Sequence, residues 1–368
     1  MQALFIKLLL LVTTTVGYLV PNPGGEYNVT VTIGPLTDYT RNDRELMLSV
    51  FQPAKCSSTV SIPYMPNMTA NFQGPFFQQV FDVPVNISPL LLEAQLPVCP
   101  GYPSNCSLSN EDSPILLFSP GYSIPRTYYN YLASAISSEG FIVITIDHPG
   151  DANIITYPDG HTIINNDTVQ NLDTIRKQIP VVAADVSFII DQLSNATAVA
   201  ELLPHRGHRA FSTDHVAMLG HSLGGIAAVT AAGQDCRLRG AINWDGTFLA
   251  LPAELSQPVL LMSHGHADYS WPEAWPLLKG PKLWVDIANT THLTFSDGPT
   301  LFEASGQDPA AFGDLLGTIP PTRMVQILVE YSTAWMNGVF AGKIGGALLD
   351  GQEPGRFPEA SVVLKDNY

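Results

Sequence analysis

A serine framed by glycines offers a nucleophile for acyl transfer. Ser222 lies in residues 220–224, which read Gly-His-Ser-Leu-Gly and match the Gly-x-Ser-x-Gly pattern. In that pattern the serine occupies a sharp, strained turn from a strand into a helix, and the glycines leave room for the turn. Residues 214–219 predict a short buried strand before the serine, and residues 226–232 predict a helix of small residues after it. This setting predicts a nucleophile elbow.

A serine hydroxyl attacks a carbonyl only when a base accepts its proton and an acid orients that base. His292 is the best candidate for the base, because it lies in the loop just after the last predicted strand of the core, 282–287. Two carboxylates compete for the role of the acid. Asp245 closes the strand after the nucleophile helix, and Asp268 follows the next strand. Position along the chain favours neither, so both stay open at this point.

An acyl transfer site also needs two backbone N–H groups that stabilise the developing oxyanion. Leu223 supplies one, since it begins the helix after the nucleophile. The second is expected in the loop after the predicted strand 115–118. Pro120 has no N–H group, and Gly121 permits a bend that directs the amide of Tyr122 toward the site. We therefore predict an oxyanion hole formed by Leu223 and Tyr122.

The elements that must position these residues alternate between strand and helix from residue 114 onward. Such alternation predicts an α/β fold in which helices cover both faces of a mostly parallel sheet. Predicted strands are 115–118, 141–146, 214–219, 240–244, 258–262 and 282–287, and predicted helices are 126–139, 172–193, which Pro180 kinks or splits, and 323–340. Antiparallel strands 27–33 and 45–52 precede them.

No repeat or low-complexity segment divides this alternation, so a single domain over residues 18–368 is predicted. Two excursions interrupt it, at about residues 54–113 and 151–171. The first lacks clear periodicity, and the second is predicted to be a polar loop. Residues 350–368 are expected to form a peripheral tail.

The amino terminus and the composition indicate where the protein works. Residues 1–17 have the basic, apolar and small-residue segments of a secretory signal peptide, with a signal anchor as the alternative. The apolar run is too short to span a bilayer, and no later segment is long and apolar enough. The formal charge of −16 disfavours nucleic acids and anionic membranes as partners. We predict a secreted protein. Seven glycosylation sequons follow the signal peptide, at Asn28, Asn67, Asn86, Asn105, Asn166, Asn195 and Asn289.

Cysteines and histidines indicate disulfides rather than a metal. Four cysteines, an even number, predict two disulfides in an oxidising compartment, and the sequence does not choose among the three pairings. Cys99 and Cys106 are expected to fix the first excursion. The candidates are Cys56, Cys99, Cys106 and Cys236. His264, His266 and Asp268 lack the signature of a fourth metal ligand, so neither a metal nor another cofactor is expected.

Four stretches, in order, resemble the plasma-type platelet-activating factor acetylhydrolases, a branch of the α/β-hydrolases. They are residues 44–53 (RELMLSVFQP), 117–122 (LFSPGY) continuing to 140–148, 220–225 (GHSLGG) and 292–297 (HLTFSD). The resemblance covers roughly residues 40–340. It implies the α/β-hydrolase fold, with antiparallel strands at the start of the sheet. It also implies that Asp245 is the acid and that the oxyanion donors are Leu223 and Tyr122.

The resemblance further implies calcium-independent hydrolysis of short or oxidised sn-2 acyl groups on phospholipids. Pro120-Gly121 stands where the family has His-Gly, and both excursions can reshape the pocket, so the substrate is carried over less firmly than the fold. The alternatives are a tailoring enzyme of secondary metabolism, acting as lactonase, cyclase or dehydratase, and a non-catalytic binding protein on the same fold. The presence of Ser222, Asp245 and His292 together disfavours the second. The oligomeric state is left open.

Overall fold

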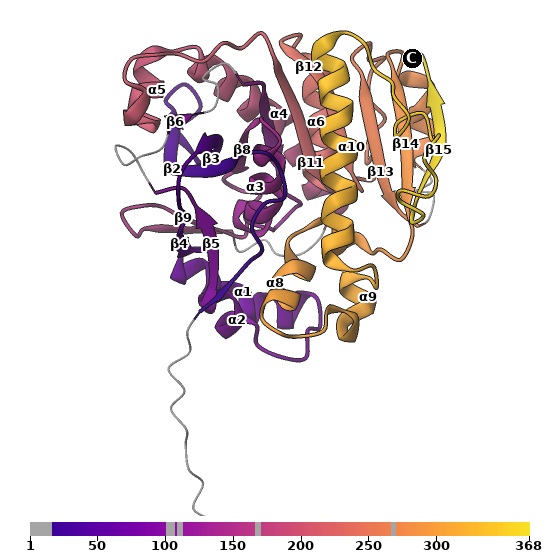
Figure 1. The fold of residues 1–368 in the computed structure, drawn as a ribbon. Helices are drawn as coiled ribbons and strands as arrows, with labels where there is room; N and C mark the ends of the chain where they lie inside the picture. Colours follow the sequence, from indigo (N-terminus) through magenta and orange to yellow (C-terminus); the bar gives the residue numbers. More distant parts are fainter. Residues whose placement is uncertain (1–16, 101–106, 109–112, 166–170, 266–269) are drawn as a thin grey trace, which may run out of the picture.

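The computed structural model of the chain describes residues 17–100, 107–108, 113–165, 171–265 and 270–368. A large twisted sheet forms its centre (Figure 1), with the strand order β15-β14-β13-β12-β11-β7-β8-β3-β2 and with β6 paired to the end of β3. The strands are β2 (Asn28–Asp38), β3 (Arg44–Lys55), β6 (Ser107–Leu108), β7 (Ile115–Ser119), β8 (Ile142–Asp147), β11 (Val216–His221), β12 (Leu238–Trp244), β13 (Val259–His264), β14 (Lys282–Ile287) and β15 (Ala360–Asp366).

The middle of this sheet is parallel and its margins are antiparallel. Strands β8, β7, β11, β12, β13 and β14 run parallel, whereas β3 is antiparallel to both β8 and β2. Every residue of β7, β8 and β11 is buried, as expected for strands covered on both faces. The predicted α/β fold is therefore confirmed.

Helices cover both faces of the sheet. Helices α3 (Asn130–Ser138) and α10 (Pro321–Ala341) share one apolar cluster with one side of the strands, and α10 crosses the front of the sheet in Figure 1. Helices α4 (Leu172–Leu193) and α6 (Leu223–Gln234) share a second cluster on the opposite side. Pro180 lies inside α4, which continues through it as one helix.

The first excursion contains regular structure that the sequence pattern did not reveal. It includes α1 (Asn67–Val80) and α2 (Ser88–Glu93), and its strands β4 (Val60–Pro63) and β5 (Ala94–Val98) form a small sheet with β1 (Tyr18–Leu19). Helix α1 lacks an N-terminal side-chain cap and contains Pro75, so its local signals are weak. Tertiary packing of Phe76 and Phe77 stabilises it instead.

Two further expectations about irregular segments are wrong. The polar loop at residues 151–171 contains a hairpin of β9 (Ile154–Thr156) and β10 (Thr162–Ile164). The expected peripheral tail contributes β15, which pairs antiparallel with β14 and forms the margin of the sheet. The remaining short helices are α5 (Ala196–Leu202), α7 (Ser270–Ala274), α8 (Gly298–Ala304), α9 (Gly313–Leu316), η1 (Arg126–Tyr129), η2 (Pro204–Arg206), η3 (Trp275–Leu277), η4 (His292–Phe295) and η5 (Pro309–Phe312).

One disulfide joins Cys56 to Cys99 and closes the first excursion. The two cysteines meet because β3 ends at Lys55 and the amide of Cys99 donates to the carbonyl of Val29 on the adjoining strand β2. As expected, Cys99 fixes this excursion, and its disulfide partner is Cys56.

The expectation that Cys236 forms a disulfide is wrong. Cys236 is a free, exposed thiol in the connection between α6 and β12, far along the sheet from β3. Cys106 lies outside the described residues.

The predicted secretory features are represented in part. Five of the seven sequon asparagines are exposed: Asn28, Asn67, Asn86, Asn195 and Asn289. Asn105, Asn166 and residues 1–16 of the predicted signal peptide lie outside the described residues. Among the helices that the structure describes, none has the length and apolar character that crossing a membrane requires.

Candidate active site

Ser222 occupies a strained turn between β11 and α6. Its backbone has φ 56° and ψ −120°, a region that a residue with a side chain rarely adopts. The flanking glycines allow this turn to form, because a Cβ at Gly220 would lie 2.3 Å from the carbonyl carbon of Gly224. A Cβ at Gly224 would lie 2.0 Å from the carbonyl oxygen of Ser119 on β7. The geometry is that of a nucleophile elbow.

The carboxyl ends of neighbouring parallel strands bring the other predicted residues to the same edge of the sheet. Asp245 directly follows β12, and His292 begins η4 after β14. The Nδ1 atom of His292 lies 2.5 Å from Oδ2 of Asp245, within hydrogen-bond distance. The structure thus places Asp245, one of the two candidate acids, against the candidate base. Asp268, the other candidate, lies outside the described residues.

A second histidine contacts the same carboxylate. His264, the last residue of β13, donates its backbone N–H to Oδ1 of Asp245 at 3.0 Å. Its ring Nδ1 lies 2.6 Å from Oδ1 and 2.7 Å from Oδ2. The sequence indicated His264 only as a weak metal-ligand candidate, and this contact was not predicted. The available signal was its place at the end of the strand next to β12.

Hydrogen bonds keep Asp245 ionised although it is buried. Burial alone would raise the pKa of this carboxyl, but the hydrogen bonds from His264 and His292 outweigh burial and hold the pKa well below its usual range. His221, in contrast, is buried in its uncharged form. Burial, together with the nearby His292, lowers the pKa of His221 well below its usual value, so the imidazole is neutral near pH 7.

The predicted oxyanion loop lies against the elbow. A Cβ on Gly121 would be 3.2 Å from Cβ of Ser222, and the amide of Gly224 donates to the carbonyl of Pro120 at 3.1 Å. Leu223 begins α6, so its N–H belongs to the first helical turn, which has no partner within the helix. Tyr122 lines the same pocket as Ser222 and Leu223. The two predicted donors are therefore brought to one site.

A pocket of about 410 Å³ opens over this edge of the sheet. Ser222 and His292 both line it, and Ser222 is partly exposed. Most of its other walls are apolar, and they include Phe81, Leu172, Ile175, Ile226, Leu249 and Leu293. A neutral, largely hydrocarbon group fits such walls.

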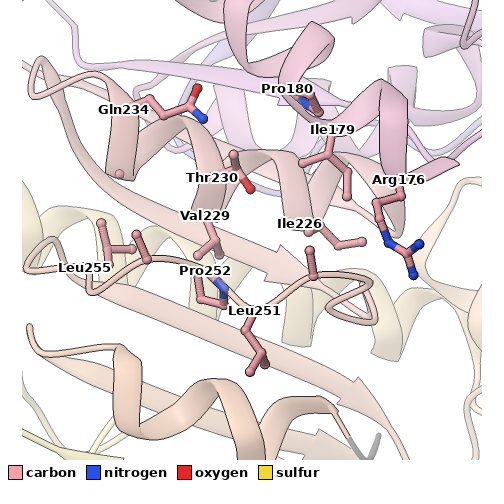
Figure 2. Close-up of a pocket in the computed structure, with 13 residues that line it drawn as sticks. Arg176, Ile179, Pro180, Ile226, Val229, Thr230, Gln234, Leu251, Pro252 and Leu255 are labelled. Carbon is pink, nitrogen blue, oxygen red and sulfur yellow. The ribbon is translucent and has the colours of Figure 1, made fainter. Parts of the chain in front are cut away.

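A second pocket of about 290 Å³ lies next to the first, and Ile226 borders both. Figure 2 shows it between α4, α6 and the segment 250–255, with Arg176 at one end and Gln234 at the other. The Nε atom of Arg176 donates to the carbonyl of Leu249 at 2.9 Å and so joins α4 to the segment that lines both pockets.

Some side chains of the site carry atoms of the kind that bind metal ions. In the described part of the chain, one group of three such residues, His221, Asp245 and His292, has its ligand atoms within 4.8 Å of one another. The Nδ1 atoms of both His292 and His264 already lie at hydrogen-bond distance from Asp245, and Nδ1 of His221 lies 2.8 Å from the hydroxyl of Tyr129. Hydrogen bonds account for the arrangement. His266, another candidate ligand, lies outside the described residues.

Comparisons with known proteins identify the family. Residues 15–182 match the family described as platelet-activating factor acetylhydrolase, isoform II. A protein of Arthroderma benhamiae named probable 1-alkyl-2-acetylglycerophosphocholine esterase is 30% identical over 95% of this chain and 94% of its own length. The chain belongs to the platelet-activating factor acetylhydrolase family of α/β-hydrolases. It is a serine-type carboxylic ester hydrolase, as the sequence predicted.

Two other similar proteins place this acetylhydrolase family member among the esterases. A platelet-activating factor acetylhydrolase of Gallus gallus is 22% identical over 65% of this chain and 64% of its own length. The solved structure of a ferulic acid esterase from Streptomyces cinnamoneus superposes with a TM-score of 0.76 at 25% identity, covering 95% of this chain and all of that one. Small-molecule esters are thus the expected kind of substrate.

Proposed function

We propose that Ser222, Asp245 and His292 are the catalytic triad and that the reaction passes through an acyl-enzyme on Ser222. The observation that supports this best is the 2.5 Å contact between His292 and Asp245, in a site whose pocket also contains Ser222 at a strained turn. Asp245 fixes the imidazole with Nδ1 protonated, which leaves Nε2 to act as the base.

In the proposed mechanism, Nε2 of His292 accepts the hydroxyl proton of Ser222 while Oγ attacks the ester carbonyl carbon. The negative oxygen of the tetrahedral intermediate accepts hydrogen bonds from the N–H groups of Leu223 and Tyr122. When the intermediate collapses, the ester C–O bond breaks and His292 returns the proton to the leaving alcohol. Water then attacks the acyl-enzyme by the same route and releases the acid.

The proposed substrate is a phospholipid with a short or oxidised sn-2 acyl group. The names of the relatives support this choice, as do the apolar walls of the pocket around Ser222. The proposal includes secretion through the signal peptide at residues 1–17, with glycans on exposed sequons. The disulfide Cys56–Cys99 is consistent with an oxidising compartment.

An ester of an aromatic acid is the second candidate substrate. The observation that favours it is the similarity in fold to the Streptomyces ferulic acid esterase over nearly the whole chain. The two candidates differ in the acid that Ser222 would carry. A panel of esters with varied acyl length, aromatic acids and head groups distinguishes them. A panel in which all esters are inert would favour the secondary-metabolite tailoring reactions.

The triad is tested with a fluorophosphonate probe, which reacts with activated serines. The wild-type protein is expected to be labelled and to hydrolyse at least one ester of the panel. The variant Ser222→Ala is expected to lose both properties, since it lacks the nucleophile. Labelling or turnover that persists in this folded variant would show that another residue is the nucleophile.

A further inference from the structure

Next to the predicted oxyanion loop lies a second row of hydrogen-bonded Ser, His and Asp side chains, which we call the Ser119 hydrogen-bond chain. Oγ of Ser119 lies 2.9 Å from Nε2 of His148, and Nδ1 of His148 lies 2.7 Å from Oδ2 of Asp185. These are the residue types and the atom order of a catalytic triad. They come from three different elements: the end of β7, the residue after β8, and the middle of α4.

The Ser119 hydrogen-bond chain is closed to solvent. Ser119 has no exposed surface, and the side chains of His148 and Asp185 are also fully buried. Ser222, by contrast, is partly exposed in a pocket and stands at a positive φ. Ser119 remains within its strand and pairs with Gly220 of β11. A substrate can reach Ser222 but not Ser119, so the Ser119 hydrogen-bond chain is not a second centre of acyl transfer.

The acidic end of the chain is held by arginines at the start of β3 and in the turn before it. Arg44 donates from Nε to Oδ1 and from Nη2 to Oδ2 of Asp185, both at 2.7 Å, and Nη1 of Arg41 lies 2.8 Å from Oδ1. Burial alone would raise the pKa of Asp185, but the hydrogen bonds from Arg44 and His148 outweigh burial and lower the pKa to about 2. Asp185 is thus an ionised, immobile anchor for His148 at neutral pH.

The serine end of the Ser119 hydrogen-bond chain lies beside the catalytic site. Ser119 is followed directly by Pro120, Gly121 and Tyr122, the loop of the proposed oxyanion donor. The carbonyl oxygen of Ser119 lies so close to the elbow that a Cβ on Gly224 would come within 2.0 Å of it. A small shift of the end of β7 would therefore move the Tyr122 amide relative to Ser222.

We propose that Ser119, His148 and Asp185 are positioning residues, which fix the oxyanion loop against the nucleophile elbow. Hydrogen bonds connect the loop through His148 to Asp185 on α4, and from there to Arg44 at the start of β3 and Arg41 before it. The inference rests on the proposed function, since it assumes that the Tyr122 N–H stabilises the oxyanion. A displacement of about 1 Å at a catalytic donor lowers turnover by as much as about a hundredfold.

The test uses the variants Ser119→Ala and His148→Asn together with their double variant. The matched control is Ser332→Ala, which removes another fully buried serine hydroxyl, on α10. The concentration of active sites is measured by fluorophosphonate titration, and kcat is expressed per titrated site. Affinity for a boronic acid, which forms a tetrahedral adduct at Ser222, reports on the oxyanion hole separately from substrate binding.

Each single variant is expected to lower kcat per site by about tenfold to a hundredfold and to weaken boronic acid binding in parallel, while KM changes little. The double variant is expected to lose no more than the more impaired single variant, because both changes interrupt one chain of hydrogen bonds. Ser332→Ala is expected to retain kcat per site even if it lowers the melting temperature.

Two results would overturn the inference. One is a kcat per titrated site in Ser119→Ala equal to that of Ser332→Ala. This result would show that the Ser119 hydrogen-bond chain stabilises the fold but does not position the oxyanion loop. The other is fluorophosphonate labelling of Ser119 in Ser222→Ala, which would show that this serine is accessible. Failure of the proposed function is recognised separately, because Ser222→Ala would then keep its esterase activity.

Discussion

Single side chains differ in this site by their backbone setting and access rather than by their type. Ser222 and Ser119 both stand near a histidine and an aspartate, yet only Ser222 has a positive φ and lines a pocket. Asp245 is notable for its two imidazole neighbours, His264 and His292. The backbone N–H and ring Nδ1 of His264 contact the carboxylate and so limit its rotation.

The role of Asp245 leads to a prediction about the acid of the triad. Asp245→Asn is expected to lower kcat by about 10⁴-fold, because an amide no longer stabilises the Nδ1-protonated imidazole. Asp268→Asn, the matched control, is expected to leave kcat nearly unchanged. Steady-state kinetics on one ester, with circular dichroism to confirm folding, measures both. The reverse pattern would assign the acid to Asp268.

Short elements hold the catalytic residues by contacts beyond the site. The segment that begins at His292 with η4 continues to Asp297. Oδ2 of Asp297 accepts a hydrogen bond from the amide of Tyr131 at 2.7 Å, and Oδ1 accepts one from the amide of Leu132 at 3.0 Å. The hydroxyl of Tyr64 donates to the same carboxyl group. Asp297 therefore ties the segment of His292 to the first turn of α3 and to the end of β4.

The buried position of Asp297 leads to a pH prediction. Burial raises the pKa of Asp297 to about 7, although hydrogen bonds from Tyr64, Tyr131 and Leu132 act in the opposite direction. The folded state thus binds the proton more tightly than the unfolded state. The stability from this group is fully present below about pH 4 and is lost as the pH rises through about 7.

We expect the stability advantage of the wild type over Asp297→Asn to shrink by an amount on the order of 4 kcal/mol between pH 4 and 8. Denaturant unfolding at several pH values measures the free energy of unfolding of both proteins. If the difference between them does not change with pH, the carboxyl group of Asp297 does not titrate in this way.

The molecule as a whole depends on contacts that join segments far apart in sequence. The chain's final strand, β15, completes the margin of the sheet beside β14, and the first excursion packs α1 and α2 against the same apolar cluster as α3 and α10 (Figure 1). The disulfide Cys56–Cys99 closes this excursion, with 43 residues of sequence separation. Cys236, on the other half of the sheet, remains free.

Removing the disulfide is expected to destabilise the fold. In the double variant Cys56→Ser with Cys99→Ser, the free energy of unfolding should fall by about 4 kcal/mol, because closing a loop of this length restricts the unfolded chain. Cys236→Ser is the control and should unfold at the wild-type denaturant concentration. Guanidinium unfolding measures the change, and equal midpoints for both variants would contradict the stabilising role.

The sequence by itself determined the features that local patterns encode. Fully apolar runs such as 115–118 predict strands that are covered on both faces, and the glycines around Ser222 fit only a tight strand-to-helix turn. The places of Ser222 and His292 after predicted strands then indicated the nucleophile and the base. Position along the chain left Asp245 and Asp268 both open as the acid, and only the family resemblance favoured Asp245. Pairing between distant segments carries no such signal, so β15 and the partner of Cys56 were not predicted.

Only the tertiary structure decided which side chains meet. His264 reaches Asp245 because β13 lies next to β12 in the sheet. Ser119 reaches Asp185 through His148 because α4 shares one apolar cluster with β7 and β8. Such contacts depend on strand order, register and the packing of helices on the sheet. Strand order, register and helix packing arise from many long-range interactions together, whereas the tendency of a segment to form a helix or a strand depends on a few neighbouring residues.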